Sequence, residues 1–421
     1  PELISPDSPT QRVGGEPLPG FETVDHAAPM LSLDSAADSA AVHRFDERLR
    51  KAVGDQLEVR YVVEPKLDGA SVELVYEDGV LSGAATRGDG RRGEAILANV
   101  RTIPAVPLKL RQEEREVPSF LSLRGEVIMQ AVAFDRLNER LINEGRDPFA
   151  NPRNASAGAL RQLDSRITAS RPLDVYVYDI LAASGEPVST QWEVLQALRQ
   201  WGLRVNDLPR RVESVEEIIE YHHYLMEHRD DIGYEIDGVV IKLDDVAARQ
   251  ALGVTSHHPR WAFAFKFPPR KEITRVDRII ASVGRTGVVT PVALMRPVEI
   301  GGVTVSRATL HNREEVARKD IREGDRVRVQ RAGDVIPQVV ERVSEPGRRR
   351  SRRFRLPSHC PSCGTGLIER GPFTVCPNSF DCPAQLVGRL LHLGSRQALD
   401  IEGLGEESAK LLVAEGLVGR L

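Results

Sequence analysis

The sequence predicts a multidomain α+β protein, and three observations lead to this fold class. The chain has 421 residues, which is too many for one ordinary core and suggests roughly three domains of about 150 residues. After Pro268 the pattern changes from mixed helix and strand to short Val- and Ile-rich strands. All four cysteines follow within residues 360–382. We therefore expect an α+β domain over residues 1–268, a β-barrel over 269–356, a four-cysteine module over 357–384 and the start of a helical domain over 385–421.

The first domain is predicted to interleave helices and strands. Residues 1–20 are rich in Pro, Ser and Gly and are expected to be irregular, and an Ala-rich helix is expected from near Ser35 to Arg50. The Val-rich residues 59–76 have β character, and Asp78-Gly79 before residues 80–86 predicts a hairpin. Further helices are expected over residues 132–144, 191–201 and 215–228, and further strands over residues 121–129 and 175–181.

The second domain is strongly basic. Residues 269–356 hold 21 Lys and Arg against 11 Asp and Glu, a net of +10, whereas the rest of the chain holds 36 against 50, a net of −14. Such asymmetry favours a module that neutralises phosphates, and a solvated basic surface without a partner is the alternative. About five short strands between residues 279 and 343, separated by Gly and Pro, suit a small barrel of the oligonucleotide-binding (OB) type.

The overall composition is that of a water-soluble protein. Hydrophobic residues make up 41% and charged residues 28%, and no apolar run approaches the ~18 residues that cross a bilayer. The first twenty residues lack the apolar segment of a signal peptide. We expect a cytoplasmic, monomeric protein without membrane contact. Because the first residue is not Met and the sequence stops in a helical pattern, we also expect a piece of a longer protein.

A lysine lies between two carboxylates in the first β-like run. Glu64, Lys66 and Asp68 are two residues apart, so they would share a face of a regular strand. A lysine that attacks phosphorus must be neutral, whereas carboxylates favour its charged form, so a metal ion, further positive charge or desolvation would have to oppose them. A surface salt bridge on a strand is the alternative interpretation of this pattern alone.

Two later segments, each an apolar β-like run, also contain a lysine. In residues 261–268 the aromatic Phe263, Phe265 and Phe267 alternate with small residues and Lys266, which suits a fixed charge aimed into a cleft. In residues 235–242, Asp237 and Lys242 are an odd number of positions apart, so they would point to opposite faces of a regular strand. Both can face one site only if Gly238 bends or bulges the strand.

Together these motifs resemble the NAD-dependent DNA ligases of bacteria over nearly the whole chain. Residues 66–69 (Lys-Leu-Asp-Gly) resemble the Lys-x-Asp-Gly motif of nucleotidyltransferases. Later motifs follow in the order of the family: Arg124-Gly125-Glu126, residues 237–242 and Phe265-Lys266-Phe267. Further similar runs are residues 86–90, 151–154, 160–164 and 283–287. The resemblance implies a nucleotidyltransferase (adenylation) domain followed by an OB-fold.

The resemblance implies a covalent mechanism and a role for each site residue. Lys66 would attack the α-phosphorus of NAD, release nicotinamide mononucleotide and hold AMP, which would pass to the 5′-phosphate of a nick and be displaced by the 3′-hydroxyl. This is the reaction of a DNA ligase (NAD+) in replication and repair. The remaining expected roles are catalysis by Asp68, nucleotide contacts by Ser32, Leu33, Glu64, Arg87 and Glu126, binding of Mg²⁺ (or Mn²⁺) by Asp237, phosphate neutralisation by Lys242 and Lys266, and contacts with nicked duplex DNA by Arg153, Arg161 and Arg285.

The cysteines have the spacing of a metal site, Cys360-x2-Cys363-x12-Cys376-x5-Cys382. Two close pairs of thiolates can surround a zinc ion tetrahedrally, and a site without an open position is structural. Two disulfides are the alternative. Beyond this zinc finger, the pattern around Gly403 and Gly405 resembles a helix-hairpin-helix element that contacts DNA phosphates through backbone N–H groups, although an ordinary Gly-rich turn has the same residues.

The sequence departs from the family at both ends. Family members begin with a helical domain for the nicotinamide mononucleotide half of NAD and end with a BRCT domain, and neither has a counterpart here. We therefore expect this chain to react poorly with NAD and still to seal a nick that is already adenylated. Two other interpretations remain: an ATP- or GTP-dependent nucleotidyltransferase, which the cysteine module disfavours, and a non-catalytic nick-binding protein, which retention of Lys66, Asp237, Lys242 and Lys266 disfavours.

Overall fold

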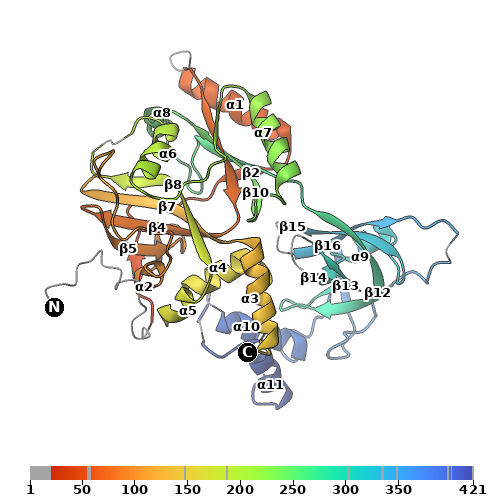
Figure 1. The fold of residues 1–421 in the computed structure, drawn as a ribbon. Coiled ribbons are helices and arrows are strands. Elements are labelled where there is room, and N and C mark those ends of the chain that lie inside the picture. Colours follow the sequence, from red (N-terminus) through yellow and green to blue (C-terminus); the bar gives the residue numbers. More distant parts are fainter. Residues whose placement is uncertain are drawn as a thin grey trace. The chain divides into compact units, whose positions relative to one another are not determined.

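The computed structural model divides into two compact units, Pro1–Pro268 and Pro269–Leu421 (Figure 1). It describes residues 20–54, 58–146, 148–185, 188–300, 304–332, 336–347, 349–395, 398–399 and 401–419. The predicted irregular segment at the start of the chain lies, up to residue 19, outside the described residues. Among the described residues, no helix is long and apolar enough to cross a membrane.

The first unit is built on two sheets whose strands are mostly antiparallel. One has the strand order β2-β11-β10-β3-β9, the other β5-β4-β7-β8, and β1 pairs with β6 separately. The strands are β1 (Thr23–Asp25), β2 (Asp34–Ala36), β3 (Tyr61–Leu67), β4 (Ala70–Glu77), β5 (Val80–Thr86), β6 (Arg92–Glu94), β7 (Phe120–Met129), β8 (Leu173–Ala183), β9 (Arg210–Val212), β10 (Ile236–Leu243) and β11 (Ala262–Lys266). The helices are α1 (Ser39–Val53), α2 (Leu97–Val100), α3 (Ala131–Asn143), α4 (Pro152–Leu160), α5 (Ser165–Ala169), α6 (Gln191–Gln200), α7 (Val215–His228) and α8 (Val246–Leu252).

Local chemistry explains where several of these elements begin and turn. The predicted hairpin is confirmed as β4–β5, and Asp78 and Gly79 both have positive φ, as a two-residue type I′ turn requires. The helix expected from near Ser35 begins later, at Ser39, because the Asp38 side chain accepts a hydrogen bond from the Ala41 N–H. Ser35 instead lies in β2, which pairs in parallel with β11.

The Val-rich run at residues 59–76 forms two strands in different sheets. The chain leaves β3 after Leu67 and enters β4 at Ala70. A Cβ at Gly69 would lie 2.3 Å from the carbonyl oxygen of Val127, so only glycine fits at this crossing. The glycine of the Lys-x-Asp-Gly motif therefore allows the chain to pass from one sheet to the other directly after the lysine.

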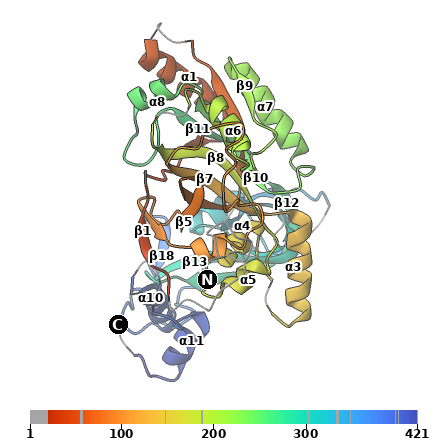
Figure 2. The ribbon, with the colours of Figure 1, turned by 60° about the vertical axis from the view of Figure 1, so that its left-hand side comes forward.

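Helices α1 and α7 cover one face of the five-stranded sheet (Figures 1 and 2). Their buried residues, among them Phe45 and Tyr221, share a core with Tyr61 and Val63 of β3. The opposite face of β3 is turned toward the second sheet, because Val62 packs in the core of that sheet. Glu64 and Lys66 have the parity of Val62, so their side chains lie between the two sheets.

The second unit contains the predicted barrel. Strands β12, β15, β16, β14 and β13 follow one another, and pairing of β13 with β12 closes the ring. Strand β18 of the cysteine module also pairs with β13. The elements are β12 (Lys271–Val283), β13 (Val288–Glu299), β14 (Thr304–Thr309), α9 (Arg313–Lys319), β15 (Arg326–Ala332), β16 (Ile336–Val343), β17 (Ile368–Arg370), β18 (Phe373–Val375), α10 (Pro383–Gly394) and α11 (Glu406–Ala414). The predicted α+β fold class and the predicted OB-type barrel are confirmed.

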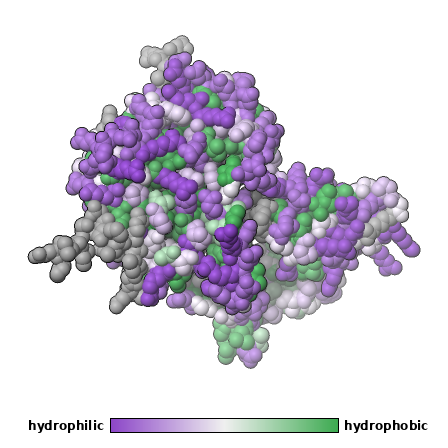
Figure 3. Space-filling model, in the orientation of Figure 1, coloured by the Kyte–Doolittle hydropathy of each residue, from purple (hydrophilic) through white to green (hydrophobic). Residues whose placement is uncertain are grey.

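Apolar side chains are exposed at the end of the second unit. In the hydropathy view, green atoms gather at the lower end, where Figure 1 places α11 (Figure 3). Leu411 on this helix is 61% exposed and Leu417 just after it is 72% exposed.

Candidate active site

Lys66 shares a carboxylate with a second lysine. Its Nζ donates a hydrogen bond to Asp237 Oδ1 at 2.7 Å, and Lys266 Nζ lies 3.4 Å from Asp237 Oδ2. The three side chains come from the neighbouring strands β3, β10 and β11. The Lys66 side chain is 22% exposed, so it is partly open to solvent and to a ligand. This arrangement holds two positive groups around one acidic group at one end of the three inner strands of the sheet.

A β-bulge places Asp237 in this cluster. The register with β3 shifts between Ile236, opposite Leu67, and Gly238, opposite Lys66, which leaves Asp237 as the extra residue. A Cβ at Gly238 would lie 2.4 Å from the carbonyl oxygen of Phe265, so the position requires glycine. The prediction that Gly238 must bulge for Asp237 and Lys242 to face one site is confirmed.

Glu64 and Lys242 form a buried ion pair deeper between the sheets. Lys242 Nζ lies 2.9 Å from Glu64 Oε1 and 3.3 Å from Asp179 Oδ2, and it donates to the carbonyl oxygen of Tyr178 at 3.1 Å. Glu64 is only 5% exposed. Burial raises the pKa of Glu64, and the positive charge of Lys242 opposes this rise. The pair keeps a carboxylate and an ammonium group together where neither has access to bulk water.

The two carboxylates that flank Lys66 in sequence do not pair with it. Asp68 lies beyond the end of β3 and accepts a hydrogen bond from Arg153 Nη1 at 2.8 Å. Burial raises the pKa of Asp68, and Arg153 opposes the rise. The regular strand that would place Glu64, Lys66 and Asp68 side by side ends at Leu67, so each acquires a different partner.

The Arg-Gly-Glu motif and the segment before β2 meet at the other sheet. Glu126 Oε2 accepts hydrogen bonds from Ser71 Oγ at 2.7 Å and from the Tyr178 hydroxyl at 3.2 Å, and burial raises the pKa of Glu126. Arg124 Nη1 donates to the carbonyl oxygen of Leu31 at 3.0 Å. This bond fixes the backbone directly before the predicted nucleotide contacts, exposed Ser32 and half-buried Leu33.

The remaining predicted residues lie on the surfaces of their units. Arg87, which follows β5, is exposed, and so is Arg161 at the end of α4. Arg285 is exposed in the turn between β12 and β13 of the second unit. Gly403 has positive φ and Gly405 is the N-cap of α11. The predicted nucleotide contact of Arg87 and the predicted DNA contacts of the other groups stay predictions.

Sequence reasoning missed two residues that contact the Glu64 and Lys242 pair, and a third that contacts one of these two. Asp179 lies on β8, where a carboxylate within the run Tyr-Val-Tyr-Asp was the available signal. Gln191 donates a hydrogen bond to Glu64 at 2.9 Å and is fully buried. Arg249 donates to Gln191 at 2.9 Å. A buried glutamine at the start of an amphipathic helix gives no sequence signal of its contact.

The four cysteines lie together and fit a zinc ion. Their Sγ atoms are all within 4.8 Å of one another, with 3.6 Å between Cys363 and Cys376 and 3.9 Å between Cys360 and Cys382. Four sulfurs in a tetrahedron with Zn–S bonds of 2.3 Å lie about 3.8 Å apart. A disulfide needs about 2.05 Å, and all four thiols are free, so the disulfide alternative is wrong for this structure. The cluster could hold zinc.

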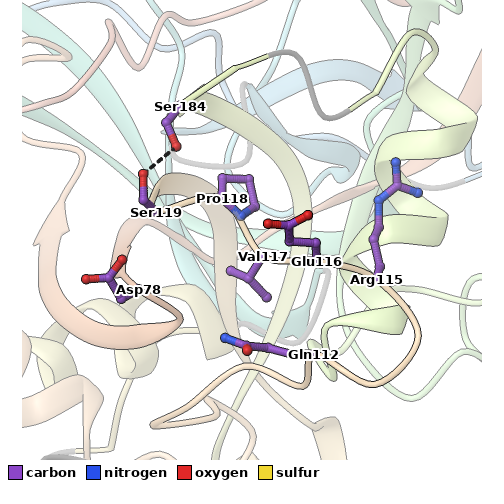
Figure 4. Close-up of a pocket in the computed structure, with 8 residues that line it drawn as sticks. All are labelled: Asp78, Gln112, Arg115, Glu116, Val117, Pro118, Ser119 and Ser184. Carbon is purple, nitrogen blue, oxygen red and sulfur yellow. Dashed lines mark hydrogen bonds between the residues drawn. The ribbon is translucent and has the colours of Figure 1, made fainter.

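A pocket of about 670 Å³ lies elsewhere in the first unit (Figure 4). Asp78 and Ser184 are among its lining residues, and Ser119 and Ser184 are hydrogen-bonded there. Asp78 follows the end of β4 that is opposite to Gly69. A strand of this length spans about 25 Å, so the pocket is separate from the Lys66 cluster.

Comparison with known proteins matches both units. A family model described as the NAD-dependent DNA ligase adenylation domain matches residues 18–270, and one described as the NAD-dependent DNA ligase OB-fold domain matches residues 273–351. Curated relatives named DNA ligase include those of Haloferax volcanii (53% identical over 99% of this chain and 58% of its own length), Alkalilimnicola ehrlichii (52%, 99% and 62%) and Geobacter sulfurreducens (50%, 99% and 62%). The chain spans about three fifths of the length of these relatives.

Proposed function

Because this chain belongs to the NAD-dependent DNA ligase family, we propose that it seals nicks in duplex DNA through a lysyl-AMP intermediate on Lys66. The observation that carries the proposal is the cluster in which Asp237 contacts Lys66 Nζ at 2.7 Å and Lys266 Nζ at 3.4 Å. A nucleophile, a carboxylate in contact with its ammonium group and a second cation are the groups that phosphoryl transfer needs.

The proposed first step uses NAD as the AMP donor. Lys66 Nζ forms a bond to the α-phosphorus while the pyrophosphate bond breaks and nicotinamide mononucleotide leaves. Asp237 Oδ1, already hydrogen-bonded to Nζ, is placed to accept the proton that the ammonium group must lose. Mg²⁺ or Mn²⁺, with Asp237 among its ligands, would neutralise charge on the phosphates. Lys242 and Lys266 add fixed positive charge on the same side of the sheet.

The nucleotide is proposed to lie between the two sheets beside Lys66. Glu64 and Ser32-Leu33 would contact the base or its sugar, and Arg87 and Glu126 the ribose region. Buried carboxylates favour a ligand that brings hydrogen-bond donors, because an unpaired buried carboxylate is costly. Asp68 would orient Arg153 through the hydrogen bond of 2.8 Å that it accepts from Nη1 of this arginine.

The DNA contacts are proposed to come from both units. Arg153, Arg161 and Arg285 would neutralise phosphates, and the net charge of +10 over residues 269–356 favours such a role. Gly403 and Gly405 would let backbone N–H groups at the start of α11 approach a phosphate. Zinc, held by the four cysteines, would stabilise the fold next to β13, with which β18 pairs.

Nicked DNA that already carries AMP on its 5′-phosphate provides the first arm of the test. We expect the chain to seal this substrate. Mass spectrometry of the Lys66 peptide should show only a weak AMP adduct after incubation with NAD, and none after incubation with ATP or GTP. Sealing of the adenylated nick does not need the nucleophile, so Lys66→Ala should lose the adduct and retain sealing.

The matched control is Lys51→Ala, since Lys51 is an exposed lysine on α1. This substitution should change neither the AMP adduct nor the sealing of the adenylated nick. An adduct that persists in Lys66→Ala would show that another residue is the nucleophile. A folded wild-type chain that does not seal the adenylated nick would contradict ligase activity for this chain.

A further inference from the structure

We propose that Gln191 and Arg249 are positioning residues that orient Glu64, so that one of its carboxylate oxygens is presented as the acceptor that selects an amino-bearing purine. This inference rests on the proposed function, because it takes Glu64 as a contact of the bound nucleotide. It assigns a role to two residues that lie outside the motifs and that contact the site only through Glu64 and its neighbours.

Gln191 connects Glu64 to the body of the first unit. It is the first residue of α6 and is fully buried. Its Nε2 donates to Glu64 Oε1 and to the carbonyl oxygen of Tyr178, both at 2.9 Å. Both acceptors need an N–H group, so the amide nitrogen must face the site.

Arg249 fixes this orientation of the amide. Its Nη1 donates to Gln191 Oε1 at 2.9 Å. Because a guanidinium group has donors and no acceptor, the glutamine oxygen must face Arg249 and the glutamine NH₂ group must face Glu64. A flipped amide would place two donors together and would lose all three contacts.

Arg249 is itself held rigidly. It is 6% exposed, its Nε donates to the carbonyl oxygen of Leu243 at 2.6 Å, and its guanidinium lies 4.4 Å from the centre of the Trp261 ring. Leu243 directly follows Lys242 on β10. The same strand therefore supplies the cationic partner of Glu64 and the anchor for the arginine.

These contacts distinguish the two oxygens of Glu64. Oε1 accepts a hydrogen bond from Gln191 Nε2 and forms the ion pair with Lys242 Nζ, each at 2.9 Å, whereas no described residue donates a hydrogen bond to Oε2. An amide donor and a cation both favour the ionised form of the carboxylate, against the rise in pKa that burial causes. Because Gln191 and Lys242 both lie against Oε1, Oε2 is the oxygen that can accept a hydrogen bond from a donor that the ligand brings.

An acceptor of fixed direction discriminates between purines. Adenine carries an exocyclic amino group, which donates, whereas hypoxanthine carries a carbonyl oxygen at the same position, which cannot. A carboxylate that is free to rotate could instead accept from the ring N–H of hypoxanthine. Loss of the Gln191 and Arg249 contacts should therefore lower the discrimination between the two bases more than it lowers the rate with either one.

The experiment compares two nicked DNA substrates whose 5′-phosphate is capped with AMP or with inosine monophosphate. We expect the wild-type chain to seal the AMP-capped nick faster. In Gln191→Leu, which keeps the bulk and removes the amide, the ratio of the two rates should fall about tenfold, as expected for a lost hydrogen bond to a charged group. Arg249→Lys keeps the charge but cannot bridge Leu243 and Gln191, so its ratio should fall less.

A matched control removes a buried amide elsewhere in the unit. Asn206 is 8% exposed and donates to the Tyr234 hydroxyl, so Asn206→Ala should leave the ratio unchanged. If Gln191→Leu does not fold, Arg249→Lys and Gln191→Asn carry the comparison. An unchanged ratio in folded variants, even with slower sealing of both substrates, would overturn the inference. A wild-type chain that seals neither nick would instead overturn the proposed function.

Discussion

Replacing Lys242 with Met tests whether the buried pair is held together as the distances indicate. Lys242 Nζ lies 2.9 Å from Glu64 and 3.3 Å from Asp179, and its side chain is 5% exposed. Met keeps most of the aliphatic stem, so the main loss is the positive charge. Removing one partner of a buried ion pair costs about 3–5 kcal/mol, because the other partner remains buried without compensation. We expect the free energy of unfolding of the first unit to fall by about this amount at neutral pH.

The size of this loss should depend on pH in a definite direction. Burial raises the pKa of Glu64, and removing Lys242 removes its charge and its hydrogen bond, both of which lower this pKa, and leaves only the smaller effect of Arg249. The folded-state pKa in the variant therefore rises further above that of the unfolded chain. A carboxyl group with a raised folded-state pKa contributes stability that is present below its unfolded-state pKa and is lost as the pH rises through the folded-state pKa. The difference between Lys242→Met and wild type should thus be largest near pH 8 and smaller near pH 5.5.

Tryptophan fluorescence during urea unfolding can measure this effect on one unit alone. The chain has three tryptophans, Trp192, Trp201 and Trp261, and all lie in the first unit. The control is Lys51→Met, an exposed position where the same substitution should change stability by less than about 0.5 kcal/mol. The reasoning would be refuted if Lys242→Met lost no more free energy of unfolding than Lys51→Met, or if its loss grew as the pH fell.

Two further predictions concern the cysteine cluster and the bulge. Unfolding the purified chain in the presence of a colorimetric chelator should release one zinc ion per chain. The Cys363→Ser variant should release less zinc, and its second unit should be less resistant to proteolysis. A wild-type chain that is as resistant without zinc as with it would argue against a structural metal. Gly238→Ala should destabilise the first unit by about 1–3 kcal/mol, because its Cβ would lie 2.4 Å from the Phe265 carbonyl, whereas Gly20→Ala, with no atom within 4 Å, should be nearly neutral in the same urea assay.

The parts of the structure that the sequence predicts are those decided by neighbouring residues. Asp78-Gly79 specifies a hairpin because both residues tolerate positive φ, and the helix over residues 215–228 begins at a capping box formed by Ser214 and Glu217. The spacing of the cysteines likewise predicts their cluster. In each case the residues that interact belong to one short segment of the sequence, so no knowledge of the rest of the fold is needed.

The parts that the sequence does not predict depend on residues far apart in the chain. Ser35 lies in a strand rather than a helix because it pairs with Ala264, more than two hundred residues later. The contact between Gln191 and Glu64 joins residues 127 positions apart, and it is set by the packing of α6 beside β8. Helix amphipathicity predicts that the Gln191 end of α6 is covered, but it does not predict which carboxylate the amide meets.

The bulge at Asp237 depends both on its neighbouring residues and on strands that are distant in the sequence. Val239 and Ile241 pack in the core under α1 and α7, and in a regular strand Asp237 would share their face. A carboxylate in that core would be buried without a partner, which is costly. The extra residue reverses the parity, so Ile236 enters the core and Asp237 emerges beside Lys66. One strand thereby contributes an apolar face to the core, Lys242 to the deep ion pair and Asp237 to the more exposed lysine.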